Sequence, residues 1–113
     1  MSIQFALEAE TALDECVFTI SIYRADGDWS VGQTSADKKV VWPAIAAGQQ
    51  LSGQLLLEPI CLTPADYKIC FSAFSKDLQI CYAMTEVTLG FSVRSHYQTW
   101  GKFIHPCEWV RYD

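Results

Sequence analysis

The residues that could support catalysis are few, and their spacing matches no catalytic motif. His105 and Glu108 are three positions apart, but in an extended segment this offset points the two side chains to opposite faces. Neither His96 nor His105 has a recognisable acidic partner, and no serine stands in a G-x-S-x-G motif. Gly101-Lys102 lacks the upstream glycine and the downstream Ser or Thr of a phosphate-binding loop. The sequence therefore predicts that the chain is not an enzyme and holds no metal or cofactor.

Paired carboxylates are a second kind of catalytic group, because glycoside hydrolysis uses two of them that meet in space and not in sequence. Three glutamates near the start of the chain are the candidates: Glu8, Glu10 and Glu15. We interpret them as solvated charges, which leaves the prediction of a non-enzymatic chain unchanged.

Aromatic residues are plentiful, since the chain has four Trp, five Tyr and six Phe. The alternation along the expected strands places some of them on solvated faces, beside small hydroxyl side chains. Sugar rings stack their C–H faces on aromatic rings, and sugar hydroxyls pair with Ser, Thr, Lys and carboxylate groups. The candidate carbohydrate-binding residues are Thr19, Ser21, Tyr23, Trp29, Lys68, Ser72, Phe74, Tyr82 and Thr88. The alternative is an ordinary outer sheet face, because Thr and Tyr are also good strand formers.

Apolar and polar residues alternate with period two over most of the chain, which predicts β-strands. Strands are expected at residues 3–10, 18–23, 29–31, 40–42, 51–57, 67–74, 78–82, 87–93 and 101–112. Asp26-Gly27 predicts a tight hairpin turn after the second of these, because glycine supplies the positive φ that such turns need. The even spacing of short strands predicts one domain over residues 1–113, an all-β, immunoglobulin-like antiparallel sandwich of about eight strands.

The apolar faces of these strands define an expected core. The residues predicted to be buried are Phe18, Ile20, Ile22, Tyr67, Ile69, Phe71, Leu89, Phe91 and Val93. The last strand, residues 101–112, is expected to be pinned to this core by Trp109. The polar stretch 94–99 before it could serve as a hinge for strand exchange between two protomers, so we expect a homodimer.

Composition excludes several classes of partner. The net charge of −5 and the scatter of the eight Lys and Arg residues argue against a nucleic-acid surface and an anionic membrane. No apolar stretch approaches the roughly 20 residues needed to span a bilayer, and the first residues lack the pattern of a signal peptide. The five cysteines form no C-x-x-C pair, and we expect free thiols in a reducing, cytoplasmic compartment.

Five short motifs follow one another in a defined order along the chain. They are YRADG at 23–27, VGQT at 31–34, LTPADY at 62–67, FSV at 91–93, and the terminal set Gly101, Pro106 and Trp109. Together they resemble the C-terminal domain of Wzt, the ATP-binding subunit of O-antigen polysaccharide ABC exporters, over residues 9–110. The resemblance implies a β-sandwich that recognises the capped end of an exported glycan and dimerises by exchanging its last strand. Similar modules are appended to glycosyltransferases and methyltransferases, and no Walker motif is present here.

The sequence thus favours a non-catalytic carbohydrate-binding module for a bacterial O-antigen-type polysaccharide, acting in export or assembly of the glycan. An ABC exporter or a glycosyltransferase module is the expected protein partner. The alternative is a protein–protein interaction or dimerisation module on the same sandwich, with no glycan ligand of its own.

Overall fold

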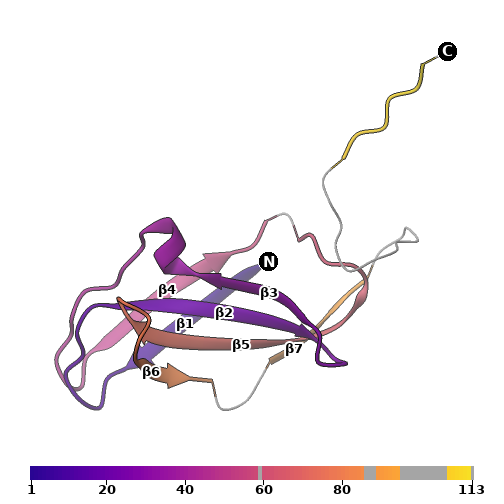
Figure 1. Cartoon of the computed structure of the whole chain (residues 1–113). Helices are drawn as coiled ribbons and strands as arrows, with labels where there is room; N and C mark the ends of the chain where they lie inside the picture. Colours follow the sequence, from indigo (N-terminus) through magenta and orange to yellow (C-terminus); the bar gives the residue numbers. More distant parts are fainter. Residues whose placement is uncertain (59, 86–88, 95–106, 113) are drawn as a thin grey trace.

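The computed structural model describes residues 1–58, 60–85, 89–94 and 107–112. Within these ranges, seven strands form two antiparallel sheets that face each other, and one short 3₁₀ helix follows the third strand (Figure 1). The elements are β1 (Ser2–Glu8), β2 (Cys16–Arg24), β3 (Trp29–Thr34), η1 (Ser35–Lys38), β4 (Gln50–Leu56), β5 (Ala65–Ser75), β6 (Cys81–Met84) and β7 (Leu89–Val93). The predicted antiparallel β-sandwich is therefore confirmed.

The two sheets differ in size. In the described part of the chain, the small sheet consists of β1 and β4, paired from Ser2–Leu56 to Glu8–Gln50. The large sheet has the order β3-β2-β5, and the far edge of β5 pairs with β6 near its C-terminal end and with β7 near its N-terminal end. The two-stranded sheet is too narrow to cover the whole inner face of the larger one, which leaves apolar clefts along both open sides.

Strands β2 and β5 form the centre of the large sheet because their sequences alternate cleanly. In β2, Phe18, Ile20 and Ile22 are buried on the inner face, whereas Thr19 and Ser21 on the other face are half-buried. The hairpin that follows β2 has the predicted turn, with Gly27 at φ 96° and the Asp28 N–H donating to Asp26 Oδ1 over 3.1 Å. Alternation therefore sorts the side chains of the large sheet into an inner and an outer face.

The core consists of two clusters between the sheets. One contains Cys16, Phe18, Leu51 and Ala73, and burial raises the pKa of the Cys16 thiol. The other contains Ile20, Ile22, Leu62 and Tyr67, and the Tyr67 hydroxyl donates to the Thr63 carbonyl over 2.6 Å.

The expected core is confirmed at its centre and is wrong at its edge. Phe18, Ile20, Ile22 and Tyr67 are buried. Four further residues are only half-buried: Ile69, Phe71, Phe91 and Val93. Leu89 is 67% exposed, because it lies on the edge strand β7, beyond the cover of the two-stranded sheet.

Two other expectations are corrected. Residues 40–42 form no strand; only Trp42 makes an isolated bridge, to Cys16. The polar stretch before them instead forms η1, in which the Ala36 N–H donates to the Thr34 hydroxyl and after which Lys39 adopts the left-handed conformation (φ 59°). At the other end of the chain, residues 107–112 form no strand, and Trp109 is 94% exposed and not pinned to the core. Residues 101–106 of the expected last strand, and 95–99 of the expected hinge, lie outside the described residues.

Among the described residues, no helix is both long and apolar enough to cross a bilayer.

Candidate functional site

The outer face of the large sheet carries most of the predicted site. Cross-strand register pairs Thr19 with Ser72 and Tyr23 with both Lys68 and Trp29, so these side chains share one face. The predicted residues that lie on this face are Thr19, Ser21, Tyr23, Trp29, Lys68, Ser72 and Phe74. Alternation along β2 and β5 therefore gathers six of the nine predicted side chains, and the pairing of β3 with β2 adds Trp29.

The two remaining predicted residues do not join this face in the described structure. Tyr82 packs on the core cluster around Cys16 and Phe18, between the sheets. Its placement follows from a register shift, because Phe74 pairs with Cys81 while Ala73 pairs with Ala83, so that Tyr82 is an unpaired extra residue. The prediction that Tyr82 flanks the outer face is therefore wrong. Thr88 lies outside the described residues.

Tyr23 and Trp29 form an aromatic pair at one end of this face. Their ring centroids are 6.3 Å apart and their planes differ by 23°. A second register shift, which skips Ser30, sets Trp29 opposite Tyr23. The Trp29 indole is 64% exposed, and its Nε1–H donates to the Val31 carbonyl over 2.8 Å. The pair thus offers a solvent-facing aromatic surface whose indole is held in one orientation.

Gly32 makes this orientation possible. A Cβ atom at position 32 would lie 2.5 Å from Trp29 Cζ2 and 2.9 Å from Cε2, so the indole lies directly against the glycine backbone. Sequence reasoning did not identify Gly32 as part of the site. A glycine inside a strand is a signal that another group approaches the backbone closely, and here that group is Trp29.

We expect Gly32→Ala to displace the Trp29 indole while the sandwich stays folded, because the added methyl group meets only an exposed side chain. The indole N–H resonance of Trp29 in a ¹H–¹⁵N spectrum should shift as its bond to the Val31 carbonyl is lost. Gly90→Ala is the matched control, since a Cβ at that position meets only the Tyr67 carbonyl oxygen at 3.7 Å. An unchanged indole resonance in Gly32→Ala would contradict this packing.

A polar cluster lies beside the aromatic pair, where β5 meets β7. The Ser92 hydroxyl donates to Asp66 Oδ1 over 2.6 Å, and Arg94 Nη2 donates to the same oxygen over 3.2 Å. These contacts lower the pKa of Asp66, and the hydrogen bond from the Ser92 hydroxyl has a larger effect than the one from the Arg94 guanidinium. A lowered pKa favours the folded state above the pKa of the unfolded chain, and this contribution is lost as the pH falls through the folded value. At neutral pH the cluster therefore presents a fixed carboxylate.

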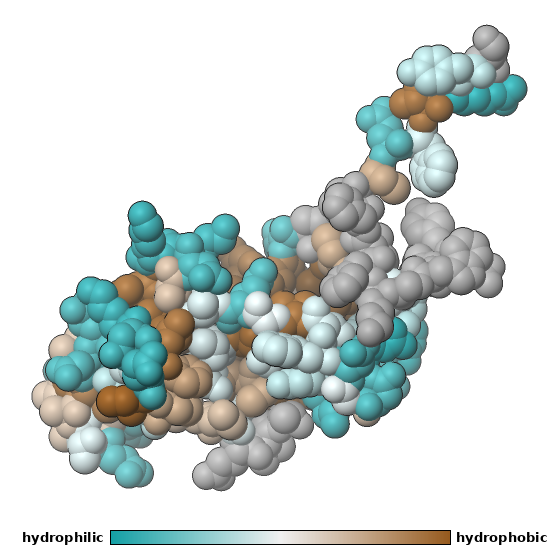
Figure 2. All heavy atoms as spheres, in the orientation of Figure 1, coloured by the Kyte–Doolittle hydropathy of each residue, from teal (hydrophilic) through white to brown (hydrophobic). Residues whose placement is uncertain are grey.

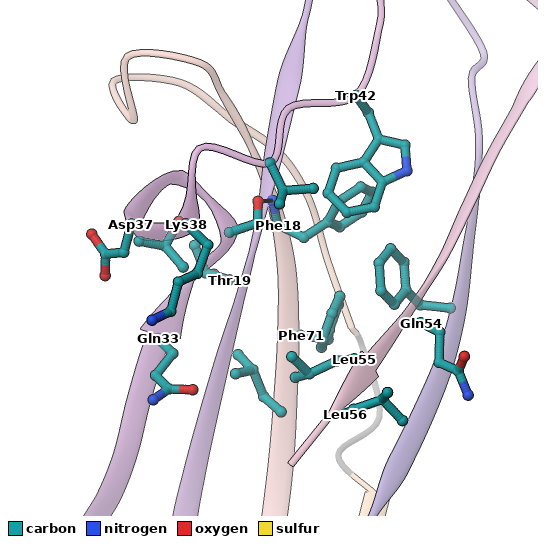
Figure 3. Close-up of a pocket in the computed structure, with 15 residues that line it drawn as sticks. Phe18, Thr19, Gln33, Asp37, Lys38, Trp42, Gln54, Leu55, Leu56 and Phe71 are labelled. Atoms are coloured by element: carbon teal, nitrogen blue, oxygen red, sulfur yellow. Dashed lines mark hydrogen bonds between the residues drawn. The ribbon is translucent and has the colours of Figure 1, made fainter. Parts of the chain in front are cut away.

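Two apolar clefts open between the sheets. The first, of about 440 Å³, lies between β3–η1 and β4 and has Phe18, Phe71 and Trp42 on its walls (Figure 3). Gln54 points away from this cleft and donates to the Ser2 hydroxyl over 2.6 Å. The second, of about 630 Å³, runs along β1 opposite β6 and β7. Figure 2 shows hydrophobic side chains (brown) visible between hydrophilic ones on the face in view. The described residues that line the two clefts form no catalytic constellation.

In the part of the chain that the structure describes, no group of three or more His, Cys, Asp or Glu side chains could hold a metal ion. Both histidines lie outside the described residues.

Comparison with known proteins identifies a solved structure of similar fold. No family model matches the chain, and no curated protein sequence matches it. Among solved structures, the chain is similar to one titled "Crystal structure of the C-terminal domain of wzt", with a TM-score of 0.80 and 20% sequence identity. The match covers 98% of this chain and 69% of that one. The chain is thus a β-sandwich with the fold of the Wzt C-terminal domain, as its motifs indicated.

Proposed function

We propose that this chain is a non-catalytic carbohydrate-binding domain whose outer face, centred on Tyr23 and Trp29, binds a bacterial O-antigen-type polysaccharide. The observation that carries the proposal is the aromatic pair of the exposed Trp29 and the half-buried Tyr23, held in place across two strands beside Lys68 and the Asp66–Ser92 cluster. Likeness in fold to the Wzt C-terminal domain supports a role in export or assembly of the glycan. A cytoplasmic location, next to an ABC exporter or a glycosyltransferase module, belongs to the same proposal.

The physical case combines stacking with hydrogen bonding. The rings of Tyr23 and Trp29 supply apolar contact area that loses little conformational freedom on binding. Lys68 and Ser21 supply donors to sugar hydroxyls, and the Asp66 carboxylate supplies an acceptor. Each site should bind weakly, because a sugar hydroxyl exchanges water hydrogen bonds for protein ones with little net gain. Two sites in a dimer would raise the apparent affinity through effective concentration.

The test is calorimetric titration of the chain with a panel of purified bacterial O-polysaccharides. We expect at least one to bind, and Tyr23→Ala and Trp29→Ala each to weaken that binding about 10-fold or more, since truncation of a central Trp or Tyr commonly costs about 2 kcal/mol. Ile80→Ala is the control, because it removes a comparably exposed side chain (58%) at the opposite end of the sheet. If both aromatic variants bind as the wild type does, the glycan binds at another surface of the chain. If no polysaccharide of the panel binds, the proposed carbohydrate-binding function is wrong.

A second proposal is that the chain is also a dimerisation module, in which residues 107–112 of one protomer dock on its partner. Its support is the exposure of Trp109, Val110 and Tyr112, in a segment that lies apart from both sheets (yellow in Figure 1). Within the described residues, β1 pairs only with β4, so its outer edge is free beside the apolar cleft that faces β6 and β7. A segment with exposed aromatic and aliphatic side chains suits such an edge, because it can add a strand there and bury those side chains in the cleft.

A further inference from the structure

We propose that the glycan lies across the strands of the large sheet, over the single row Trp29–Tyr23–Lys68–Gly90, and that the site holds a segment of several sugar residues. This inference rests on the proposed function and deepens it, because it gives the direction of the bound chain and the class of ligand, an oligosaccharide segment of several sugar residues.

The register of the large sheet defines the row. Trp29 on β3 pairs with Tyr23 on β2, Tyr23 pairs with Lys68 on β5, and Lys68 pairs with Gly90 on β7. The four residues therefore stand side by side on the outer face of four adjacent strands. Strands lie about 4.8 Å apart, so the row is about 14 Å long. A row of this length is longer than one sugar ring.

The chemistry changes along the row in a way that suits a chain of rings. The aromatic pair occupies its first half, and the ammonium group of Lys68 follows. Gly90 leaves its far end without a side chain, and a Cβ placed there would meet only the Tyr67 carbonyl oxygen, at 3.7 Å. Next to Lys68 and Gly90 on the same two strands lies the Asp66–Ser92 pair, whose oxygens are within reach of a chain that follows the row.

Burial closes one direction along the strands, the direction toward the start of β2. From Tyr23 toward the start of β2, the outer face leads past Ser21 to Thr19, whose cross-strand partner Ser72 is only 7% exposed. The next outer position, Val17, is 0% exposed. A glycan that ran along the strands would soon meet side chains that it cannot reach. Trp29, Lys68 and Gly90 are exposed in the cross-strand row, and the exposed Asp66 and Ser92 lie next to it on the side away from Ser72.

The test blocks the far end of the row without touching the aromatic pair. Gly90 has no positive φ, and among the described residues an added Cβ meets only the Tyr67 carbonyl oxygen, at 3.7 Å, so Gly90→Gln should fold normally and place a bulky neutral side chain on the row. Met84→Gln is the matched control, because Met84 lies on the same sheet edge and pairs with Ser72, away from the row. The probe is the O-polysaccharide that binds in the panel, cut by partial acid hydrolysis into fragments of increasing length.

We expect the affinity of the wild-type chain to rise with fragment length from one residue to at least three. Gly90→Gln should lower the affinity for the longer fragments about 10-fold and leave the affinity for single sugar residues unchanged. Met84→Gln should bind every fragment as the wild type does. The inference is overturned if a single sugar binds as tightly as the longest fragment, or if Gly90→Gln binds every fragment as the wild type does. In either case binding that still depends on Tyr23 and Trp29 would leave the proposed function intact, whereas a panel without any binding polysaccharide would overturn both.

Discussion

Replacing Phe18 by alanine should lower the free energy of unfolding by about 3–5 kcal/mol, the range for removal of a buried aromatic ring. Phe18 is buried between the sheets, and its ring centroid lies 4.5 Å from that of Phe5, 4.9 Å from that of Trp42 and 5.9 Å from that of Phe71. Neighbours that are held this closely from both sheets cannot all move into the space that the ring leaves. The loss should appear in urea or guanidinium unfolding as a lower midpoint with an unchanged slope.

Leu89→Ala is the control for this experiment, and both variants are measured at a concentration at which the wild-type chain sediments as a monomer, because Leu89 also lines the cleft proposed for docking of a partner. The sequence places both residues on inner faces, but Leu89 is largely exposed at the sheet edge, so its truncation should change the free energy of unfolding by about 0.5 kcal/mol or less. Equal losses in the two variants would mean that the small sheet covers β7 as well as β2. No loss in Phe18→Ala would contradict the placement of the core between Phe5 and Phe71.

Alternation was sufficient to predict the two central strands and the faces of their side chains. In β2 and β5 the inner positions are apolar and most outer ones are polar, and a shift of one residue would exchange the two sets. Six of the seven site residues on the outer face follow from the same alternation, whereas Trp29 on β3 is set opposite Tyr23 by a register shift. Lys68 meets Tyr23 only through the β2–β5 pairing, and this neighbour relation could not be predicted because period two says nothing about which strands pair.

The failures have two physical sources. Register shifts break the alternation, and the one between β5 and β6 moves Tyr82 to the inner side, whereas the one between β2 and β3 sets Trp29 opposite Tyr23. The second source is sheet width. A sequence pattern marks Leu89 as inward-facing, but only the tertiary structure shows that a two-stranded sheet does not extend over it. The packing of Trp29 on Gly32 depends on both the shift and the pairing, so it was missed.

Removing residues 107–113 should convert a dimer into a folded monomer. None of the described side chains in this segment contributes to either core cluster, and Trp109, Val110 and Tyr112 are exposed, so the sandwich should keep its unfolding midpoint without them. Sedimentation velocity of the two proteins at equal concentration measures the change. Trp109→Ala should also weaken the dimer. Glu108→Gln is the control, because it changes a neighbouring polar side chain without changing its size, and it should leave the dimer unchanged.

The cleft along β1 is the docking site that this prediction favours over the cleft beside β4. The Trp42 Nε1–H already donates to the Ser52 carbonyl over 2.8 Å, so part of the outer edge of β4 is occupied, whereas the outer edge of β1 is free over its described length. Leu89 is exposed on the opposite wall of the β1 cleft, and Leu89→Lys should therefore weaken the dimer by placing a charge where Trp109 or Val110 of the partner would pack. A dimer that survives both the truncation and Leu89→Lys would have to form through another surface. A wild-type chain that sediments as a monomer at every concentration would remove the segment from assembly altogether.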